Sequence, residues 1–343
     1  MRFKWLWYLC ATTCCVVLLT GTFLIASVSS RVESAGNIAN KSAGLKNSSK
    51  SKNTGTPGKK KTTGTQAKSH CEDKPPVNPS KCNIDQKYVV GCDLPFQGGV
   101  SHDVDEHCPN EGCATRDSDK AQNKIKNNLC ATETPAPISF TSIDKLQQAV
   151  DRLVAQHKIS YGKTGPPQPA DRAKLHGLST VNASGGAVKL GEGSIVTLEA
   201  FVLDAKHDDT FPFGFGGEGV NCKNSLLEWN DIHIALGATA KAKECASVTA
   251  EIIPHFRPAV WDRFDCNPCT APHVTNPLPV KGLKVRITGQ LFFDGSHVPS
   301  SCAKPAPGGN PLRRSVWEIH PVYKIEVFDG SKFISFEDWA ATH

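Results

Sequence analysis

Acidic and histidine residues occur in close pairs along the C-terminal half of the chain, and these side chains offer the most chemistry. Two residues that are two positions apart on a strand point to the same side of it. Imidazole and carboxylate groups bind Zn²⁺ and other divalent metals, and they also transfer protons in hydrolysis. The four pairs are Asp231 with His233, Glu251 with His255, Asp294 with His297, and Glu318 with His320. If the strand ends that carry them converge, the pairs can form a metal-binding or catalytic site.

The same residues have a plainer interpretation, in which they stabilise turns and fix strand register through hydrogen bonds. We favour this structural interpretation and keep two alternatives: a metal or catalytic site, and ligand recognition without chemistry. The candidate metal ligands are His233, His255 and His320, and zinc is a divalent ion that suits them. The sequence predicts no other cofactor, and it favours a protein without enzymatic activity over an enzyme.

The strands that must position these residues are predicted from two-residue alternation of apolar and polar side chains. In the last of them, Glu318 and His320 are expected on the outward face, with Pro321 at an edge or a bulge. Three strands, a short helix near residues 258–264 and two more strands predict an OB-like five-stranded barrel, with a β-sandwich as the alternative fold. The five predicted strands are Gly193–Ala205, Asp231–Leu236, Ser247–Ile253, Leu283–Phe293 and Val316–Phe328.

The segment before the barrel is rich in cysteine and short of aliphatic residues, which predicts loops stapled by disulfides whose pairing stays open. Its cysteines are Cys71, Cys82, Cys92, Cys108, Cys113 and Cys130. Further along, we favour a bridge between Cys222 and Cys245. Residues 71–343 hold an odd number of cysteines, so at least one thiol is free, intermolecular or a ligand. Apolar periodicity predicts one helix over Ser118–Leu129 and another around residues 143–154, capped by Thr141 or Ser142.

The N-terminus has the pattern of a secretory signal, because Arg2 and Lys4 precede an uncharged apolar run over residues 5–28. The run is long enough that an uncleaved membrane anchor is the alternative. We therefore expect an exported protein, secreted or in the cell envelope. The predicted parts are a signal peptide or anchor (1–30), a disordered basic linker (31–70), the Cys-rich segment (71–135), a helix with a Pro-rich connection (136–176) and the barrel (177–343).

Charge is unevenly distributed along the chain. The formal net charge is +6, but residues 1–70 alone carry an excess of ten positive charges, so residues 71–343 are net acidic. The basic linker therefore predicts contact with an anionic membrane or wall polymer. The acidic remainder gives no strong nucleic-acid signature, because nucleic-acid binding relies on basic contacts to phosphates. The oligomeric state stays open.

A glycine-rich stretch at residues 214–219 follows the first predicted strand, and we interpret it mainly as a flexible connection. In an OB-like barrel such a loop can border the ligand face. Phe213, Phe215 and Trp229 are then the candidate ligand-binding residues, through stacking.

Several blocks of sequence resemble, in the same order, those of a family of uncharacterised exported bacterial proteins with a C-terminal OB-like β-barrel domain. These blocks are NDIHIAL (230–236), VTAEIIPHFRPAVW (248–261), VRITGQLFFDGSH (285–297) and WEIHPVYKIEV (317–327). The upstream strings HCPNEGCA (107–114) and AQNKIKNNLCA (121–131) resemble the N-terminal half of the same family. The resemblance implies export and a barrel, and it transfers no catalytic residue.

We therefore predict an exported envelope or extracellular binding protein of unknown ligand. The alternative is a metal-dependent hydrolase, phosphodiesterase-like or nuclease-like, that uses the clustered histidines and carboxylates. A second alternative is a structural envelope protein. Convergence of the imidazoles separates the binding protein from the hydrolase, because a single metal with bonds near 2.1 Å cannot use imidazoles that lie more than about 10 Å apart.

Overall fold

The protein is described by a computed structural model that covers residues 86–92, 103–130, 133–207, 218–224, 229–255, 257–266, 274, 276–308 and 310–343. All of these residues belong to one compact unit, residues 65–343. The expected signal peptide or anchor, the basic linker, Cys71, Cys82, Phe213 and Phe215 lie outside the described residues. Within the described ranges, no helix is both long and apolar enough to cross a membrane.

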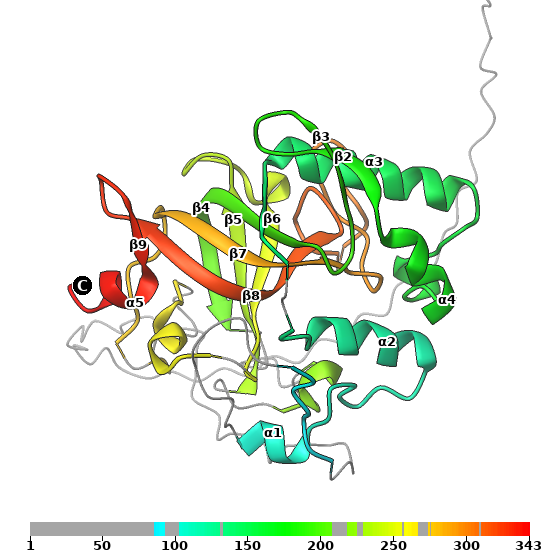
Figure 1. Cartoon of the computed structure of the whole chain (residues 1–343), viewed down its shortest axis with the longest axis horizontal. Helices are drawn as coiled ribbons and strands as arrows, with labels where there is room; N and C mark the ends of the chain where they lie inside the picture. The colour runs from blue at the N-terminus through cyan, green and yellow to red at the C-terminus, as the bar shows by residue number, and fades with distance from the viewer. Residues whose placement is uncertain are drawn as a thin grey trace, which may run out of the picture. The chain divides into compact units, whose positions relative to one another are not determined.

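Five strands close into a mixed β-barrel, which confirms the predicted OB-like fold (Figure 1). Around the barrel the strands follow the order β4, β5, β6, β8 and β7, and β7 pairs with β4 to close it. The β6–β8 pair is parallel, and the other pairs of the barrel are antiparallel. The strands are β4 (Ile195–His207), β5 (Ile232–Gly237), β6 (Val248–Ile252), β7 (Lys284–Phe293) and β8 (Trp317–Phe328).

Alternation explains only part of each barrel strand. In β7, Val285 and Ile287 are fully buried while Lys284 and Arg286 are partly exposed, as the alternating sequence predicts. From Gly289 onward every residue of β7 is buried or nearly so. The second half of the strand is covered on both faces, because helix α2 (Asp117–Lys126) packs over it.

The prediction that Glu318 and His320 face outward needs a correction. Both lie on the outer side of the barrel by alternation, but they are buried, with exposed fractions of 2% and 0%. The Cys-rich segment and α2 cover this end of β8, so the outward face here is not a solvent face. The β7–β8 register shifts beside Pro321, which confirms the predicted irregularity.

The remaining elements flank the barrel (Figure 1). Strand β1 pairs in parallel with β4, and β9 pairs with β8. These flanking helices and strands are α1 (Asp103–His107), β1 (Ala136–Ile138), α3 (Phe140–Ala155), α4 (Pro169–Arg172), β2 (Leu178–Val181), β3 (Ala187–Leu190), β9 (Phe333–Ser335) and α5 (Phe336–Ala340). The short 3₁₀ helices are η1 (Gly162–Thr164), η2 (Ala173–Leu175), η3 (Gly219–Asn221), η5 (Glu244–Ala246) and η6 (Ala259–Arg263).

Both predicted helices and the short helix after β6 are present. Helix α2 ends earlier than expected, and η6 occupies the predicted position between β6 and β7. The N-cap of α3 is neither Thr141 nor Ser142 but Ser139. The Ser139 hydroxyl accepts the backbone N–H of Ser142, whose own hydroxyl accepts the N–H of Ser139, so the two serines form a reciprocal capping box.

The favoured Cys222–Cys245 bridge is wrong. Cys222 is bonded to Cys108, and Cys245 is bonded to Cys302. Cys92–Cys130 is a third bridge, Cys113 is also disulfide-bonded, and Cys266 is a free thiol. The Cys108–Cys222 bridge ties the Cys-rich segment to the loop before β5 across 114 positions, a distance that cysteine spacing cannot reveal.

The Cys-rich segment also touches that loop through its backbone. Cys113 N donates to Gly219 O at 2.7 Å, and Gly112 has a left-handed φ of +56°. A Cβ on Gly112 would lie only 2.2 Å from Gly219 O, so glycine is required for this close approach.

Candidate functional site

A polar pocket of about 710 Å³ lies between α2 and one end of the barrel. Strands β5, β6 and β8 contribute its floor, and α2, η3, the turn after β7 and the loop before β8 contribute its walls. Five of the eight residues in the predicted acid–histidine pairs line it. The ionisable lining residues are Arg116, Asp119, Lys126, Glu218, Lys223, His233, Glu251, Asp294, His297, Arg313 and Glu318.

Strand register explains why the pairs meet at the floor. His233 on β5 lies directly opposite Glu251 on β6. Strands β6 and β8 run parallel, with Thr249 opposite Glu318. Two residues further along each strand, Glu251 and His320 are therefore neighbours on the same outer face.

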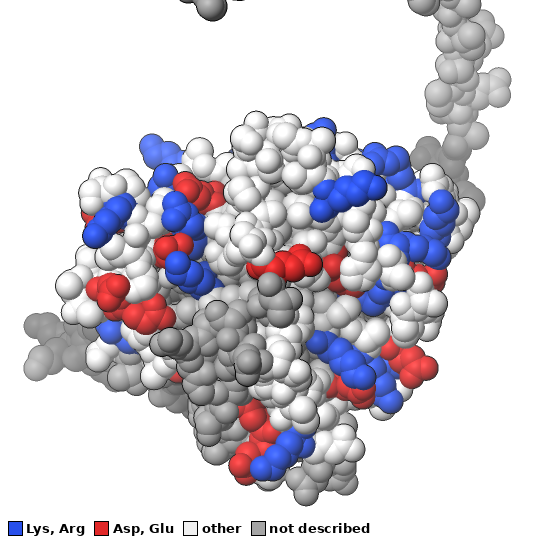
Figure 2. Space-filling view, in the orientation of Figure 1, with Lys and Arg blue, Asp and Glu red and all other residues white. Residues whose placement is uncertain are grey.

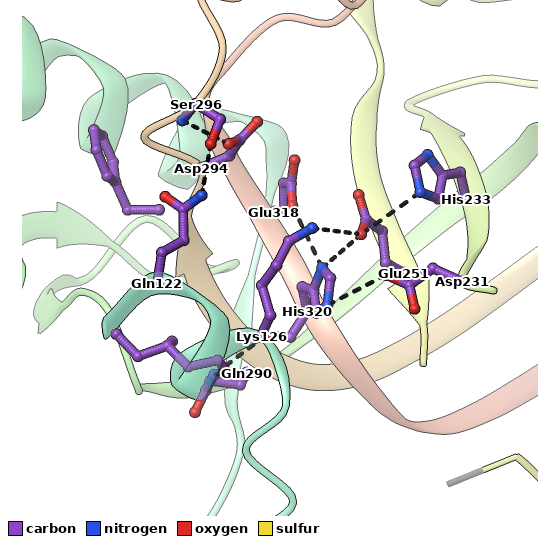
Figure 3. Close-up of polar contacts among 12 residues, drawn as sticks. Gln122, Lys126, Asp231, His233, Glu251, Gln290, Asp294, Ser296, Glu318 and His320 are labelled. Carbon is purple, nitrogen blue, oxygen red and sulfur yellow. Dashed lines mark hydrogen bonds and ion pairs between the residues drawn. The ribbon is translucent and has the colours of Figure 1, made fainter. Parts of the chain in front are cut away.

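The side chains converge on one carboxylate oxygen, Oε2 of Glu251 (Figure 3). His320 Nδ1 lies 2.7 Å from it and His233 Nε2 lies 3.8 Å from it. His320 Nε2 faces Asp231 Oδ2 at 3.9 Å, and His320 Nδ1 is 3.6 Å from Glu318 Oε2. Two of the three predicted histidine ligands, His233 and His320, thus reach the same atom, well inside the limit for a shared metal.

Three of these residues offer ligand atoms that all lie within 4.8 Å of one another, namely Asp231, Glu251 and His320. All three are buried, with exposed fractions of 0%, 4% and 0%. Within the described part of the chain, Asp231 Oδ2, Glu251 Oε2 and both ring nitrogens of His320 have no hydrogen bond of good geometry, and their contacts with one another are ion pairs. Buried polar atoms are almost always satisfied. The donor set therefore fits a bound cation.

The balance of charge at the floor also favours a bound cation. Lys126 Nζ reaches from α2 to Glu218 Oε2 at 2.9 Å. It also lies 3.8 Å from Glu251 Oε2 (Figure 3). The second fixed cation, Arg313, pairs with Glu318 and with Asp294. Five carboxylates thus face two fixed cations, and the carboxylates are Glu218, Asp231, Glu251, Asp294 and Glu318. On the outer face drawn in Figure 2, acidic and basic side chains are intermingled.

The excess of carboxylates shifts the titration of the floor. Burial raises the pKa of Asp231 and of Glu318. Burial also opposes ionisation of Glu251, but His233, His320 and Lys126 hold its pKa well below the ordinary value. Burial lowers the pKa of His320, whereas Glu251 raises it, and the net result is a pKa of about 9. Protonated groups thus balance the excess negative charge, a role that a divalent cation can also take.

A second arm of the pocket is built on the turn after β7. His297 Nδ1 lies 2.7 Å from Asp294 Oδ2, and Ser296 N donates to Asp294 Oδ1 at 2.9 Å. Arg313 Nη2 donates to the same Oδ2 atom of Asp294 at 2.5 Å. Asp294 is buried while the His297 side chain is 48% exposed, so a fixed carboxylate orients an accessible imidazole.

The loop that contains η3 is held in an unusual backbone conformation beside the site. Cys222 and Lys223 both have left-handed φ angles, 55° and 56°, which non-glycine residues rarely adopt. The Cys108–Cys222 disulfide fixes this loop. Asn221 donates from Nδ2 to Asp231 Oδ1 at 3.0 Å, so the loop positions one of the floor carboxylates.

The remaining predicted site residues lie apart from the floor. His255 bonds through Nδ1 to Asp105 and stacks on Tyr88 with ring centroids 4.2 Å apart, so it joins the N-terminal segment to the barrel. Trp229 packs on a small cluster that includes Val104 and the Cys108–Cys222 bridge.

Sequence patterns missed the fixed cations of the site. Lys126 belongs to the predicted helix, but its apolar stripe carried no sign that a lysine would be buried beside it. Arg313 lies in a loop between proline and a strand, where an arginine is ordinarily solvated. Glu218 belongs to the predicted glycine-rich connection, whose sequence gives no sign of a carboxylate at a site.

The fold and the pocket define this chain as an OB-like barrel with a buried carboxylate–imidazole cluster under a disulfide-bonded cover. Comparison of the chain with protein-family models, curated proteins and solved structures finds no match.

Proposed function

We propose that the protein is an exported binding protein whose pocket takes a divalent cation on Asp231, Glu251 and His320. The observation that carries this proposal is the convergence of these three buried side chains, whose ligand atoms lie within 4.8 Å and lack hydrogen-bond partners of good geometry among the described residues. His233 and Glu318 stand next to the same atoms and can complete or adjust the coordination.

The chemistry of the donors favours a transition ion such as Zn²⁺ or Mn²⁺. Carboxylates and a neutral imidazole bind such ions at about 2.0–2.2 Å. Two ligand atoms on one ion are then about 3–4 Å apart. The ligand atoms of Asp231, Glu251 and His320 lie within 4.8 Å of one another, so small side-chain rotations would bring them to that separation. Ion binding replaces the protons that otherwise balance the floor, so binding should release protons and weaken as the pH falls.

Export is supported by the disulfides, which persist in oxidising compartments and are rare in the cytosol. Two basic residues followed by an uncharged apolar run at the N-terminus support the same conclusion. Secretion and attachment to the envelope remain two destinations of one export route, and the basic linker favours contact with an anionic surface.

Calorimetric titration of the disulfide-bonded chain with Zn²⁺ and Mn²⁺ tests the proposal. We expect binding of one ion per chain, and an affinity at least about 100-fold weaker in Glu251→Gln and in Asp231→Asn. Glu326→Gln, on the far part of β8, is the matched control and should bind like the wild type. Two outcomes would overturn the proposal: a folded wild-type chain that binds neither ion at millimolar concentration, or binding that survives in both floor variants.

A further inference from the structure

We propose that this pocket hydrolyses phosphodiesters, with His297 as the residue that protonates the leaving oxygen and Asp294 as its positioning residue. The inference rests on the proposed cation-binding function and names a substrate class and a reaction for the same site. It is carried by a second group of side chains, Asp294, His297 and Arg313, which lines the same pocket as the proposed ligand Glu251 and includes none of the proposed ligands; Asp231 and His320 lie buried behind Glu251.

The geometry of His297 is that of a proton-transfer residue. Its Nδ1 is engaged by Asp294 at 2.7 Å, while no partner of Nε2 is found among the described residues. Since His297 lines the pocket and is about half exposed, Nε2 is available to a molecule bound there. A carboxylate that holds one ring nitrogen fixes the tautomer and the orientation of the other.

Asp294 is itself held from two sides, which suits positioning rather than proton exchange. Arg313 donates to its Oδ2 and Ser296 N donates to its Oδ1. Burial opposes its ionisation, but Arg313 and His297 keep the pKa of Asp294 well below the ordinary value. The carboxylate therefore stays ionised at neutral pH and cannot take the proton that His297 transfers.

Titration of His297 is set by the groups that surround it. The hydrogen bond that His297 donates to Asp294 raises the pKa of His297, burial lowers it, and more distant Arg313 and Glu318 act in opposite directions. The net effect is a raised pKa, which favours the protonated imidazole as the proton donor. Proton donation in the transition state works best when the pKa of the donor lies near the working pH.

The arrangement of charge favours an anionic ester over a neutral one. The floor takes a cation, and the rim carries Arg116 and Lys223, both exposed and both lining the pocket. Arg116 is paired with Asp119 at 2.6 Å, whereas Lys223 has no ion pair with a described residue. A phosphodiester presents one negative charge to the cation and the rim while its leaving oxygen faces the imidazole.

The reaction balances without any other reactant than water. Oxygen of a water molecule forms a bond to phosphorus, and the bond from phosphorus to the leaving oxygen breaks. The leaving oxygen takes its proton from His297 Nε2. The proton lost by the attacking water passes to solvent, and His297 regains a proton from solvent. The products are a phosphomonoester and an alcohol.

Steady-state hydrolysis of bis(p-nitrophenyl) phosphate by the Zn²⁺- or Mn²⁺-loaded chain tests the inference, with p-nitrophenyl acetate as the neutral ester. We expect the phosphodiester to be cleaved, and kcat to fall about 100-fold or more in His297→Gln. His176→Gln, an exposed histidine outside the pocket, is the matched control and should leave kcat unchanged. Asp294→Asn should lower kcat roughly 10- to 100-fold and move the alkaline limb of the pH profile to lower pH.

Calorimetry separates this inference from the proposed function. His297→Gln should bind Zn²⁺ and Mn²⁺ like the wild type, since His297 is not a ligand. NMR titration of His297 should give a lower pKa in Asp294→Asn, a change that a purely structural aspartate outside contact with the ring would not produce. Cation binding without cleavage of the phosphodiester, preferential cleavage of the neutral ester, or full activity in His297→Gln would each overturn the inference and leave the cation site standing.

Discussion

Lys126 is a buried cation at the floor of the site, and we expect both the stability of the site and its affinity for the proposed divalent ion to depend on it. Its side chain is 10% exposed and lies between Glu218 and Glu251. Lys126→Met keeps the length of the apolar stem and removes only the charge. Breaking a buried ion pair by removing one partner costs about 3–5 kcal/mol, because the remaining carboxylates stay buried without their counter-ion. The metal-free variant should lose that much free energy of unfolding.

The same change should strengthen cation binding. Lys126 Nζ lies 3.8 Å from Glu251 Oε2, so an ion on that oxygen sits about 5 Å from the ammonium. If the ligating carboxylates cancel half of the ion's charge, the repulsion at an effective dielectric of about 20 is about 3 kcal/mol. Lys126→Met should therefore bind Zn²⁺ or Mn²⁺ about 100-fold more tightly than the wild type.

Urea unfolding with and without the ion, together with calorimetric titration, measures both effects. Lys124→Met on the same helix is the matched control, because Lys124 forms an exposed pair with Glu111 that contributes at most about 1 kcal/mol. The reasoning is refuted if Lys126→Met unfolds like Lys124→Met, or if its affinity for the ion falls instead of rising.

Three further outcomes follow from neighbouring features. Replacing Cys108 and Cys222 together by serine should lower the free energy of unfolding in urea by about 4–5 kcal/mol, because the bridge closes a long stretch of chain. It should also weaken ion binding, because the bridge fixes the loop that contains η3 beside the floor. Unchanged ion affinity would contradict this coupling. Gly112→Ala should lower the melting temperature by several degrees, because its Cβ would lie 2.2 Å from a backbone oxygen of η3 at a left-handed φ; a wild-type melting curve would show that the segment moves freely. The pKa of Asp294 lies below its unfolded value of about 3.9, so the pairing of Asp294 with Arg313 stabilises the fold above that pH, and this stabilisation is lost as the pH falls. The difference in free energy of unfolding between wild type and Asp294→Asn, measured by urea unfolding, should therefore shrink between about pH 5 and 2. A constant difference would contradict the pairing.

Strand patterns predicted the barrel well because the physical signal is local. Alternation of buried and exposed residues, as in Val285 and Ile287 against Lys284 and Arg286, reports which face of a strand meets the core. The order of strands and the short helix then left few topologies, and the closed five-stranded arrangement is one of them.

The same patterns failed where a second layer covers the barrel. Alternation identifies the face that turns away from the barrel interior, but not whether another segment lies on it. Alternation therefore predicts the outward face for Glu318 and His320, where they lie, but it gives no sign that α2 and the Cys-rich segment bury them there. Disulfide pairing failed for a related reason, since the partner of Cys222 comes from that covering segment, 114 positions away.

The site was predicted in part. The acid–histidine pairs lie at equivalent positions of neighbouring strands, so register alone brings His233, Glu251 and His320 together. His255 lies away from this cluster, because the chain turns after β6 and places the imidazole against Asp105. Lys126 reaches the floor only through the packing of α2, and no local pattern reports that a helix will direct a lysine into a buried carboxylate cluster.

An anomalous difference map from crystals grown with Zn²⁺ tests the cation site most directly. We expect a single strong peak within about 2.2 Å of carboxylate oxygens of Asp231 and Glu251 and of a ring nitrogen of His320. A folded chain whose crystals show no peak at this position, or whose peaks lie only on surface histidines, would contradict the assignment of the buried cluster as a cation-binding centre.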